Sequence, residues 1–202
     1  MPVSLNSGAG IQLYDRTTDA VAQRKAEVQA LARFMKHFHV PISAVQPRQA
    51  DATRAWFDVF DDCVETLEEH WEIAIAEGIK FALEPHVGIP FESSAQVRRL
   101  LDAIPEMPLI YDPSHFAAQG IDVQETDRLL DRAAWVHVRD GVSGTIRAHF
   151  GEGDVDFDWI FRSLRDPGYD GGFSIEYLKS MDKDIAGDTR RGLDAALQYF
   201  PR

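Results

Sequence analysis

Residues 79–85 read IKFALEP, a short apolar run that ends at Glu84 and a proline. The run PLIYDP at residues 108–113 repeats this arrangement and ends at Asp112. Similar runs are ISAV at residues 42–45, AWVHV at residues 134–138, which includes His137, and GFSIE at residues 172–176, which ends at Glu176. Short apolar runs beside turn residues are typical of buried strands. Residues 3–5 are a weaker candidate, and with them the sequence predicts six strands.

Amphipathic segments with apolar residues at helical spacing separate these runs. They cover residues 20–38, 51–77, 94–103, 122–133, 156–164 and 184–200. Strands that alternate with helices predict parallel pairing through crossover helices. Taken alone, the alternation permits an open doubly wound sheet or a closed barrel. A glycine-rich phosphate loop after the first strand would favour the open sheet, but SGAG at residues 7–10 lacks the third glycine.

Four consecutive predicted strands end in a side chain that can bind a metal: Glu84, Asp112, His137 and Glu176. In a barrel the ends of parallel strands converge on one face, where active sites are built. Three carboxylates and one imidazole suit Mn²⁺, Mg²⁺ or Co²⁺, and Zn²⁺ also accepts such ligands. A single acid at a strand end is more often a helix cap or a turn former, and Asp112 before Pro113 fits that alternative. The repetition at four strands favours a metal site.

The formal net charge of −12 comes from 33 acidic against 21 basic residues. Such a surface repels nucleic acid and anionic membranes, so neither is expected as a partner. No apolar run is long enough to span a bilayer, and the first residues do not resemble a signal peptide. The single cysteine, Cys63, cannot form an intrachain disulfide, which fits a reducing compartment and a cytoplasmic location.

Five motifs in this order resemble the sugar isomerase/epimerase superfamily, also called xylose isomerase-like. They are FALEPH at residues 81–86, YDPSH at 111–115, VHVRD at 136–140, GEGDVD at 151–156 and SIE at 174–176. The superfamily includes endonuclease IV-type repair enzymes and inosose dehydratases. The resemblance covers about residue 40 to the C-terminus and implies an α/β fold of the TIM (β/α)-barrel type.

The resemblance also implies roles for individual residues. Glu84, Asp112, His137 and Glu176 match the shared metal ligands, and Glu84 and Glu176 match the positions of a catalytic acid and base. His115 matches a histidine that binds substrate in the epimerases and a metal in the repair enzymes. Arg139 and His86 are further candidates for substrate binding. His149 and Glu152 also lie in predicted strand-end loops and are candidate functional residues, for which a structural role is the alternative. For Arg139 the alternative is a surface base paired with Asp140.

The family barrel has eight strands, whereas six are predicted here. The resemblance therefore implies one xylose isomerase-like domain over residues 1–202 that lacks about two β/α units at its N-terminus. A truncated gene model, a fragment, or a homo-oligomer in which another subunit closes the gap would each account for this difference.

The function implied is a divalent-metal-dependent isomerase or epimerase that acts on a small sugar or polyol-derived keto compound through an enediolate. An inosose dehydratase-like lyase would use nearly the same residues. An endonuclease IV-like phosphodiesterase is disfavoured by the acidic surface and by the lack of histidines in the first predicted strand. A third alternative is an inactive relic, because an incomplete barrel would leave its site incomplete.

Overall fold

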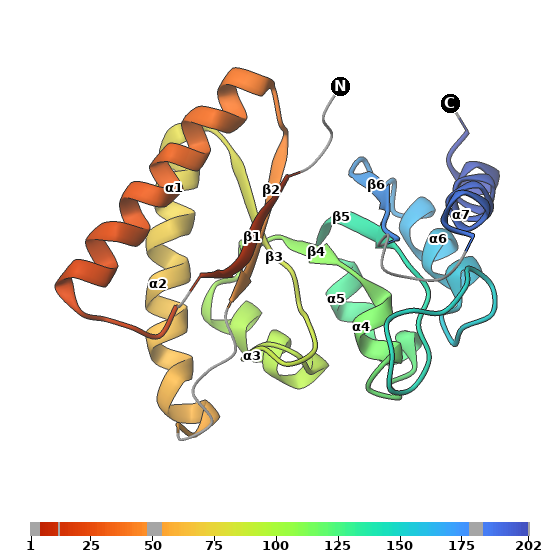
Figure 1. Ribbon diagram of the computed structural model, residues 1–202, viewed down its shortest axis with the longest axis horizontal. Coiled ribbons are helices and arrows are strands. Elements are labelled where there is room, and N and C mark those ends of the chain that lie inside the picture. The colour runs from red at the N-terminus through yellow and green to blue at the C-terminus, as the bar shows by residue number, and fades with distance from the viewer. Residues whose placement is uncertain (1–4, 12, 48–53, 178–183, 202) are drawn as a thin grey trace. The chain divides into compact units, whose positions relative to one another are not determined.

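The computed structural model describes residues 5–11, 13–47, 54–177 and 184–201 (Figure 1). The chain divides into two compact units, Met1–Leu109 and Ile110–Arg202. The boundary between the units falls inside strand β4, which spans Leu109–Tyr111.

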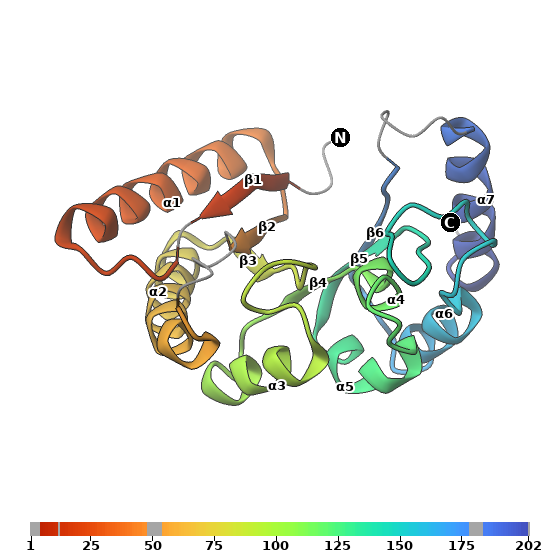
Figure 2. The same cartoon turned by 60° about the horizontal axis from the view of Figure 1, so that its bottom comes forward.

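The first unit alternates strands with long helices. Its strands are β1 (Leu5–Ile11), β2 (Ile42–Pro47) and β3 (Lys80–Leu83), and its helices are α1 (Thr18–Phe38), α2 (Trp56–Glu77) and α3 (Ser94–Ala103). Strand β2 pairs in parallel with both β1 and β3, and β3 also pairs with Leu109. Helices α1 and α2 pack side by side in both views (Figures 1 and 2).

Local sequence signals explain where these helices begin and end. Helix α2 stops at Gly78, whose backbone is left-handed with φ of 68°, a conformation that glycine adopts without steric cost. Helix α3 starts with a capping box, in which the Ser93 side chain accepts from the Gln96 backbone and the Gln96 side chain accepts from the Ser93 backbone. One side of α2 is buried, at Val59, Phe60, Cys63, Thr66, Leu67, His70 and Ala74.

The second unit holds the remaining strands, β5 (Ala133–Val138) and β6 (Gly172–Ile175), which pair in parallel with His137 opposite Ser174. Its helices are α4 (Pro113–Ala117), the 3-10 turn η1 (Val123–Thr126), α5 (Asp127–Leu130), α6 (Phe157–Arg165) and α7 (Ile185–Tyr199). Helices α6 and α7 pack on each other, and α7 also packs on β6 (Figure 2).

The two faces of the β5–β6 pair have different surroundings. A Cβ atom added to Gly192 of α7 would lie 3.3 Å from Val138 and 3.4 Å from Ile175, so these two side chains face the helix. Because side chains alternate along a strand, His137 points to the other face. Ser174 lies on that face as well, since its hydroxyl accepts from the indole N–H of Trp135 at 2.8 Å. Glu176 follows two residues later on the same side.

The predicted alternation of six parallel strands with helices is confirmed. Three details differ. The first strand runs from Leu5 to Ile11 through the glycine-rich stretch, and Val3 lies outside the described residues. Residues 122–133 form two short helical turns, and Ala133 already belongs to β5. Helix α4, directly after Asp112, was not predicted. Within the described residues, no helix is both long and apolar enough to cross a membrane.

Candidate metal centre

Asp112 is held in place by the chain that follows it. It is the N-cap of α4, and its Oδ1 accepts from the backbone N–H and the hydroxyl of Ser114 at 2.9 and 2.6 Å. Pro113 occupies the first helical turn, where no backbone N–H is needed. The helix-cap alternative for Asp112 is therefore correct, but it uses only one oxygen. The other oxygen, Oδ2, faces His137.

His137 and Glu176 bring two more ligand atoms to Asp112. The Nδ1 atom of His137 lies 2.9 Å from Glu176 Oε2 and 3.6 Å from Asp112 Oδ2. One ligand atom from each of the three residues lies within 4.8 Å of the others. Ligand atoms bound to one ion at 2.0–2.3 Å are separated by roughly 3 Å, so the three side chains have the spacing of a coordination sphere.

The environment of Glu176 Oε2 also indicates a cation site. This oxygen is buried, lies 2.9 Å from Nδ1 of His137, and has no hydrogen-bond partner of regular geometry among the described residues. A buried carboxylate oxygen without a partner is costly unless a cation or a water satisfies it. Two carboxylates and an imidazole are ordinary ligands of a divalent metal ion. The residues therefore fit such an ion.

Arg139 and His115 complete this cluster in the second unit. Arg139 is only 4% exposed, which rules out the alternative of a surface base paired with Asp140. Its Nη2 donates to Asp112 Oδ2 and, at 2.9 Å, to Nε2 of the buried His115, while its Nε donates to the Ser114 hydroxyl at 3.0 Å. Its Nη1 lies 3.5 Å from Glu176 Oε1. His115 therefore holds its own proton on Nδ1.

Opposing effects set the ionisation of the two acids. Burial would raise the pKa of Asp112, but the charge of Arg139 and the contact with His137 outweigh burial and hold that pKa well below its usual range. Burial likewise acts to raise the pKa of Glu176, but the contacts with His137 and Arg139 have the larger effect. The pKa of Glu176 therefore lies below its ordinary value. Both side chains are thus carboxylates at neutral pH and able to bind a cation.

The loop after β5 is organised by Asp140, which was not predicted as a functional residue. Its carboxylate accepts the backbone N–H groups of Gly141, Gly151, Gly153 and Val155 at 2.9 to 3.3 Å. A Cβ atom at Gly153 would lie 2.0 Å from Asp140 Oδ1, so glycine is required there. This explains the GEG motif at residues 151–153 in structural terms. Glu152 between the glycines is exposed.

His149 belongs to a separate pair. Its Nδ1 lies 2.8 Å from Oδ2 of Asp188, a fully buried acid in the first turn of α7. Asp188 also accepts from the backbone N–H of Phe150 at 2.9 Å and from Arg191 at 2.5 Å. Burial raises the pKa of Asp188, but these hydrogen bonds outweigh it and the pKa falls. Asp188 was not predicted, because an acid in the first turn of a helix is common and gives no distinct sequence signal.

Two predicted residues lie in the first unit. Glu84 follows β3, is buried, donates its backbone N–H to Val45 at 3.0 Å, and accepts from Nε2 of Gln46 at 2.5 Å. His86 is half-buried, and its Nδ1 lies 2.7 Å from the carbonyl oxygen of Val87. The Gln46 hydrogen bond fixes the orientation of the Glu84 carboxylate at the end of its strand.

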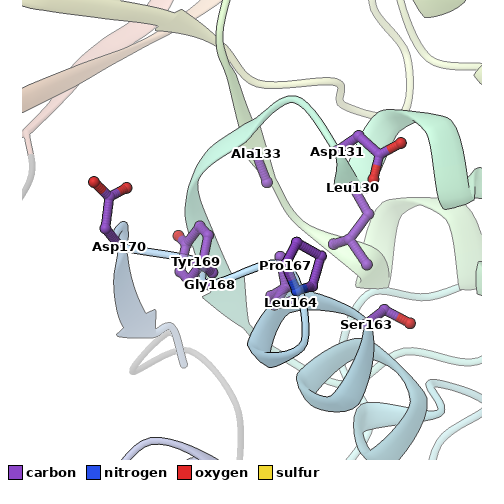
Figure 3. A pocket seen from close by; sticks show the side chains of 9 residues that line it. All are labelled: Leu130, Asp131, Ala133, Ser163, Leu164, Pro167, Gly168, Tyr169 and Asp170. Atoms are coloured by element: carbon purple, nitrogen blue, oxygen red, sulfur yellow. The ribbon is translucent and has the colours of Figure 1, made fainter.

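A cavity of about 230 Å³ lies elsewhere in the second unit (Figure 3). Ala133, the first residue of β5, lines it, as do Leu164 of α6 and Tyr169, which precedes β6. The cavity is therefore at the beginning of these strands, whereas His137 and Glu176 are at their ends. None of the predicted site residues lines it.

Comparison with known proteins bears on both the fold and the site. The model of a protein family described as xylose isomerase-like TIM barrel matches residues 2–199. An inosose dehydratase from Clostridium perfringens is 25% identical over 150 residues, which cover 58% of this chain and 50% of the relative. The chain thus spans about half the length of that relative.

Two solved structures have a similar fold. The IOLI protein, crystallised with a zinc atom, has a TM-score of 0.77 at 19% identity, with 100% of this chain and 78% of that one covered. A D-tagatose 3-epimerase-like protein has a TM-score of 0.75 at 19% identity, covering 98% of this chain and 79% of that one. The predicted TIM-barrel class of the α/β fold is confirmed by these matches.

Proposed function

The chain belongs to the xylose isomerase-like TIM barrel family, and on that basis we propose that it is a divalent-metal-dependent isomerase or epimerase of a small sugar or polyol-derived keto compound. The observation that supports this most strongly is the cluster formed by buried Asp112 and His137 with half-buried Glu176. Enzymes that move a proton next to a carbonyl need both a charge-stabilising group and a base. This cluster offers both.

Asp112, His137 and Glu176 would hold the metal, with Glu84 as the fourth ligand. The case for Glu84 is that it follows β3 directly, as Asp112 follows β4 and Glu176 follows β6, and that Gln46 fixes its carboxylate. A bound divalent cation would polarise the carbonyl of the substrate as a Lewis acid. Mn²⁺, Mg²⁺ and Co²⁺ suit the oxygen-rich set, and Zn²⁺ remains an option because a relative of the same fold binds zinc.

Glu176 is the better candidate for the base. It is a carboxylate at neutral pH, and its side chain is 28% exposed, so that a substrate can reach it. Asp112 is fully buried and bound by Ser114 and Arg139, so it would hold the metal rather than exchange a proton with the substrate. Glu84 would act as the acid on the other side of the substrate carbon. His115, His86 and Arg139 would orient the substrate oxygens.

An inosose dehydratase-like lyase is the second candidate, because an inosose dehydratase is among the relatives. A lyase of this kind removes a proton next to the carbonyl with one base and gives a proton to the departing hydroxyl with one acid. Glu176 and Glu84 would fill those two roles as well. The two reactions differ in their product, since only the lyase releases water.

The test uses purified protein loaded with Mn²⁺ and a panel of ketoses and inososes in D₂O. We expect one compound to take up deuterium next to its carbonyl, with an epimer as the product of an epimerase and a dehydrated product from a lyase. Glu176→Gln should lower turnover by about a hundredfold or more, because an amide cannot accept the proton. Glu125→Gln, which changes an exposed acid of the same unit, should not. Full turnover by metal-loaded Glu176→Gln would show that Glu176 is not the base.

A further inference from the structure

We propose that the guanidinium of Arg139 competes with the divalent cation for Asp112, so that metal binding displaces it from that carboxylate. This inference rests on the proposed metal centre. It adds a second role to a residue that the sequence suggested only for substrate binding. All of the atoms involved belong to the second unit.

The geometry points to the guanidinium as a substitute for the ion. Arg139 Nη2 donates to Asp112 Oδ2, the same oxygen that faces His137 Nδ1. Its Nη1 lies 3.5 Å from Oε1 of Glu176. One positive group thus lies between the two acids that would bind the metal.

Charge makes coexistence of the guanidinium and the metal unfavourable. With neutral histidines, Asp112, Glu176 and Arg139 carry a net charge of −1. A divalent ion bound to the same Asp112 oxygen would lie within a few ångströms of the guanidinium, and both Asp112 and Arg139 are buried. Like charges at that separation repel strongly in a protein interior. The cation therefore binds with higher affinity when the guanidinium has left Asp112.

The hydrogen bonds of Arg139 agree with this exchange. Its donors point at Asp112, Ser114 and His115. Displacement from Asp112 releases N–H groups, which are then available to a hydroxyl or an anionic group of the substrate. The substrate-binding role proposed for Arg139 thus belongs to the metal-loaded state.

The first experiment measures Mn²⁺ affinity by titration calorimetry on EDTA-treated protein. Arg139→Met, which keeps the length of the side chain without its charge, should bind Mn²⁺ about tenfold more tightly than the wild type. Arg139→Lys keeps the charge and should stay within about threefold of the wild type. The control is Arg190→Met on an exposed position of α7, which should also stay near the wild type. Unchanged or weaker binding by Arg139→Met would overturn the proposal.

A second measurement uses the wild-type protein, so it does not depend on whether a variant folds. In ¹⁵N-arginine-labelled wild-type protein, the Nε–H of Arg139 is buried and bonded to Ser114, so it should give a slowly exchanging NMR signal without metal. Saturation with diamagnetic Mg²⁺ should shift that signal and speed its exchange with water. An unchanged signal in the presence of bound Mg²⁺ would contradict displacement.

The outcomes separate this inference from the proposed function. A wild-type chain that binds no divalent ion contradicts the metal centre itself. The displacement of Arg139 alone is contradicted if the wild type binds metal but two further results hold. Arg139→Met binds Mn²⁺ no more tightly than the wild type, and the Arg139 NMR signal of the wild type does not change when Mg²⁺ binds.

Discussion

Asp112 shows how one side chain serves both the fold and the site. One of its oxygens caps α4 through Ser114, and the other is shared by Arg139 and faces His137. A buried carboxylate without such partners would be neutral, because burial disfavours its charge. The partners of Asp112 therefore keep available the charge that a metal site requires.

His70 is a buried titratable residue away from the site, and burial makes its protonation unfavourable in the folded chain. It lies on α2 with 0% exposure, and in the part of the chain that the structure describes neither of its ring nitrogens has a hydrogen-bond partner. Burial, and to a smaller extent Arg24, lowers its pKa from 6.5 to about 4. Between these two values the unfolded chain takes up a proton that the folded chain refuses, so stability falls as the pH falls. Above pH 6.5 the effect is absent.

We therefore predict that His70 makes the free energy of unfolding about 2 kcal/mol lower at pH 5 than at pH 7.5. Urea denaturation at both pH values measures this difference. His70→Leu should remove that part of the pH dependence, whereas His37→Leu, at an exposed position of α1, should keep it. Equal pH dependence in His70→Leu and the wild type would show that His70 is protonated in the folded state or is not buried.

The sequence predicted the site residues better than it predicted their partners. Acids and a histidine at the ends of successive strands suffice to predict Asp112, His137 and Glu176 as neighbours, because parallel strands end at one edge. The contact of Arg139 with Asp112 could not be predicted, since it depends on the rotamer of a long side chain. The roles of Asp140 and Asp188 likewise depend on how loops fold back on them.

At the scale of elements, the β5–β6 pair positions His137 against Glu176. Trp135 lies opposite Gly172, and a Cβ atom at Gly172 would come within 2.1 Å of its ring. The indole also donates to Ser174 on the same face. The glycine at the start of β6 is thus needed for the register that brings Glu176 to the backbone carbonyl of Val138.

We predict that Gly172→Ala lowers the free energy of unfolding by about 2 kcal/mol through overpacking, and weakens Mn²⁺ binding because β6 shifts. Chemical denaturation and metal titration measure the two effects. Removing the ring with Trp135→Leu should make the added methyl group much less costly, so the double variant should be more stable than the sum of the single changes implies. Strict additivity of the two changes would contradict a clash between these residues.

The elements that were predicted less well lack a strong periodic signal. Strand β1 contains Gly8 and Gly10, which are poor strand formers, and its pairing with β2 supplies what local propensity does not. The sequence predicts one helix over residues 122–133. In the structure the Thr126 hydroxyl forms hydrogen bonds with the Tyr111 hydroxyl and the Val123 carbonyl, and the chain turns there. The bounds of α1 and α7 were predicted within two residues. Helix α2 begins at Trp56 rather than at residue 51, and residues 51–53 lie outside the described residues.

At the scale of the whole molecule, β1 pairs with β2 and β6 pairs with β5, and within the described residues neither strand has a second neighbour. Each of these strands therefore has one unpaired edge, and unpaired strand edges promote association. Helices α1 and α2 also expose Phe34, Phe38 and Phe57 to between 45% and 67%. We predict that the 202-residue chain, expressed alone, associates into homo-oligomers or precipitates. Light scattering coupled to size-exclusion chromatography measures this, and a monodisperse monomer with a cooperative melting transition would contradict the prediction.

We propose that one divalent ion binds at the strand ends of this chain. Crystals grown with Mn²⁺ test this metal site directly through the anomalous signal of the metal. We predict one strong anomalous peak per chain, roughly 2.0–2.3 Å from carboxylate oxygens of Glu84, Asp112 and Glu176 and from a ring nitrogen of His137. A crystal saturated with Mn²⁺ that shows no peak there, or shows the carboxylate of Glu84 far from the other three residues, would contradict the account.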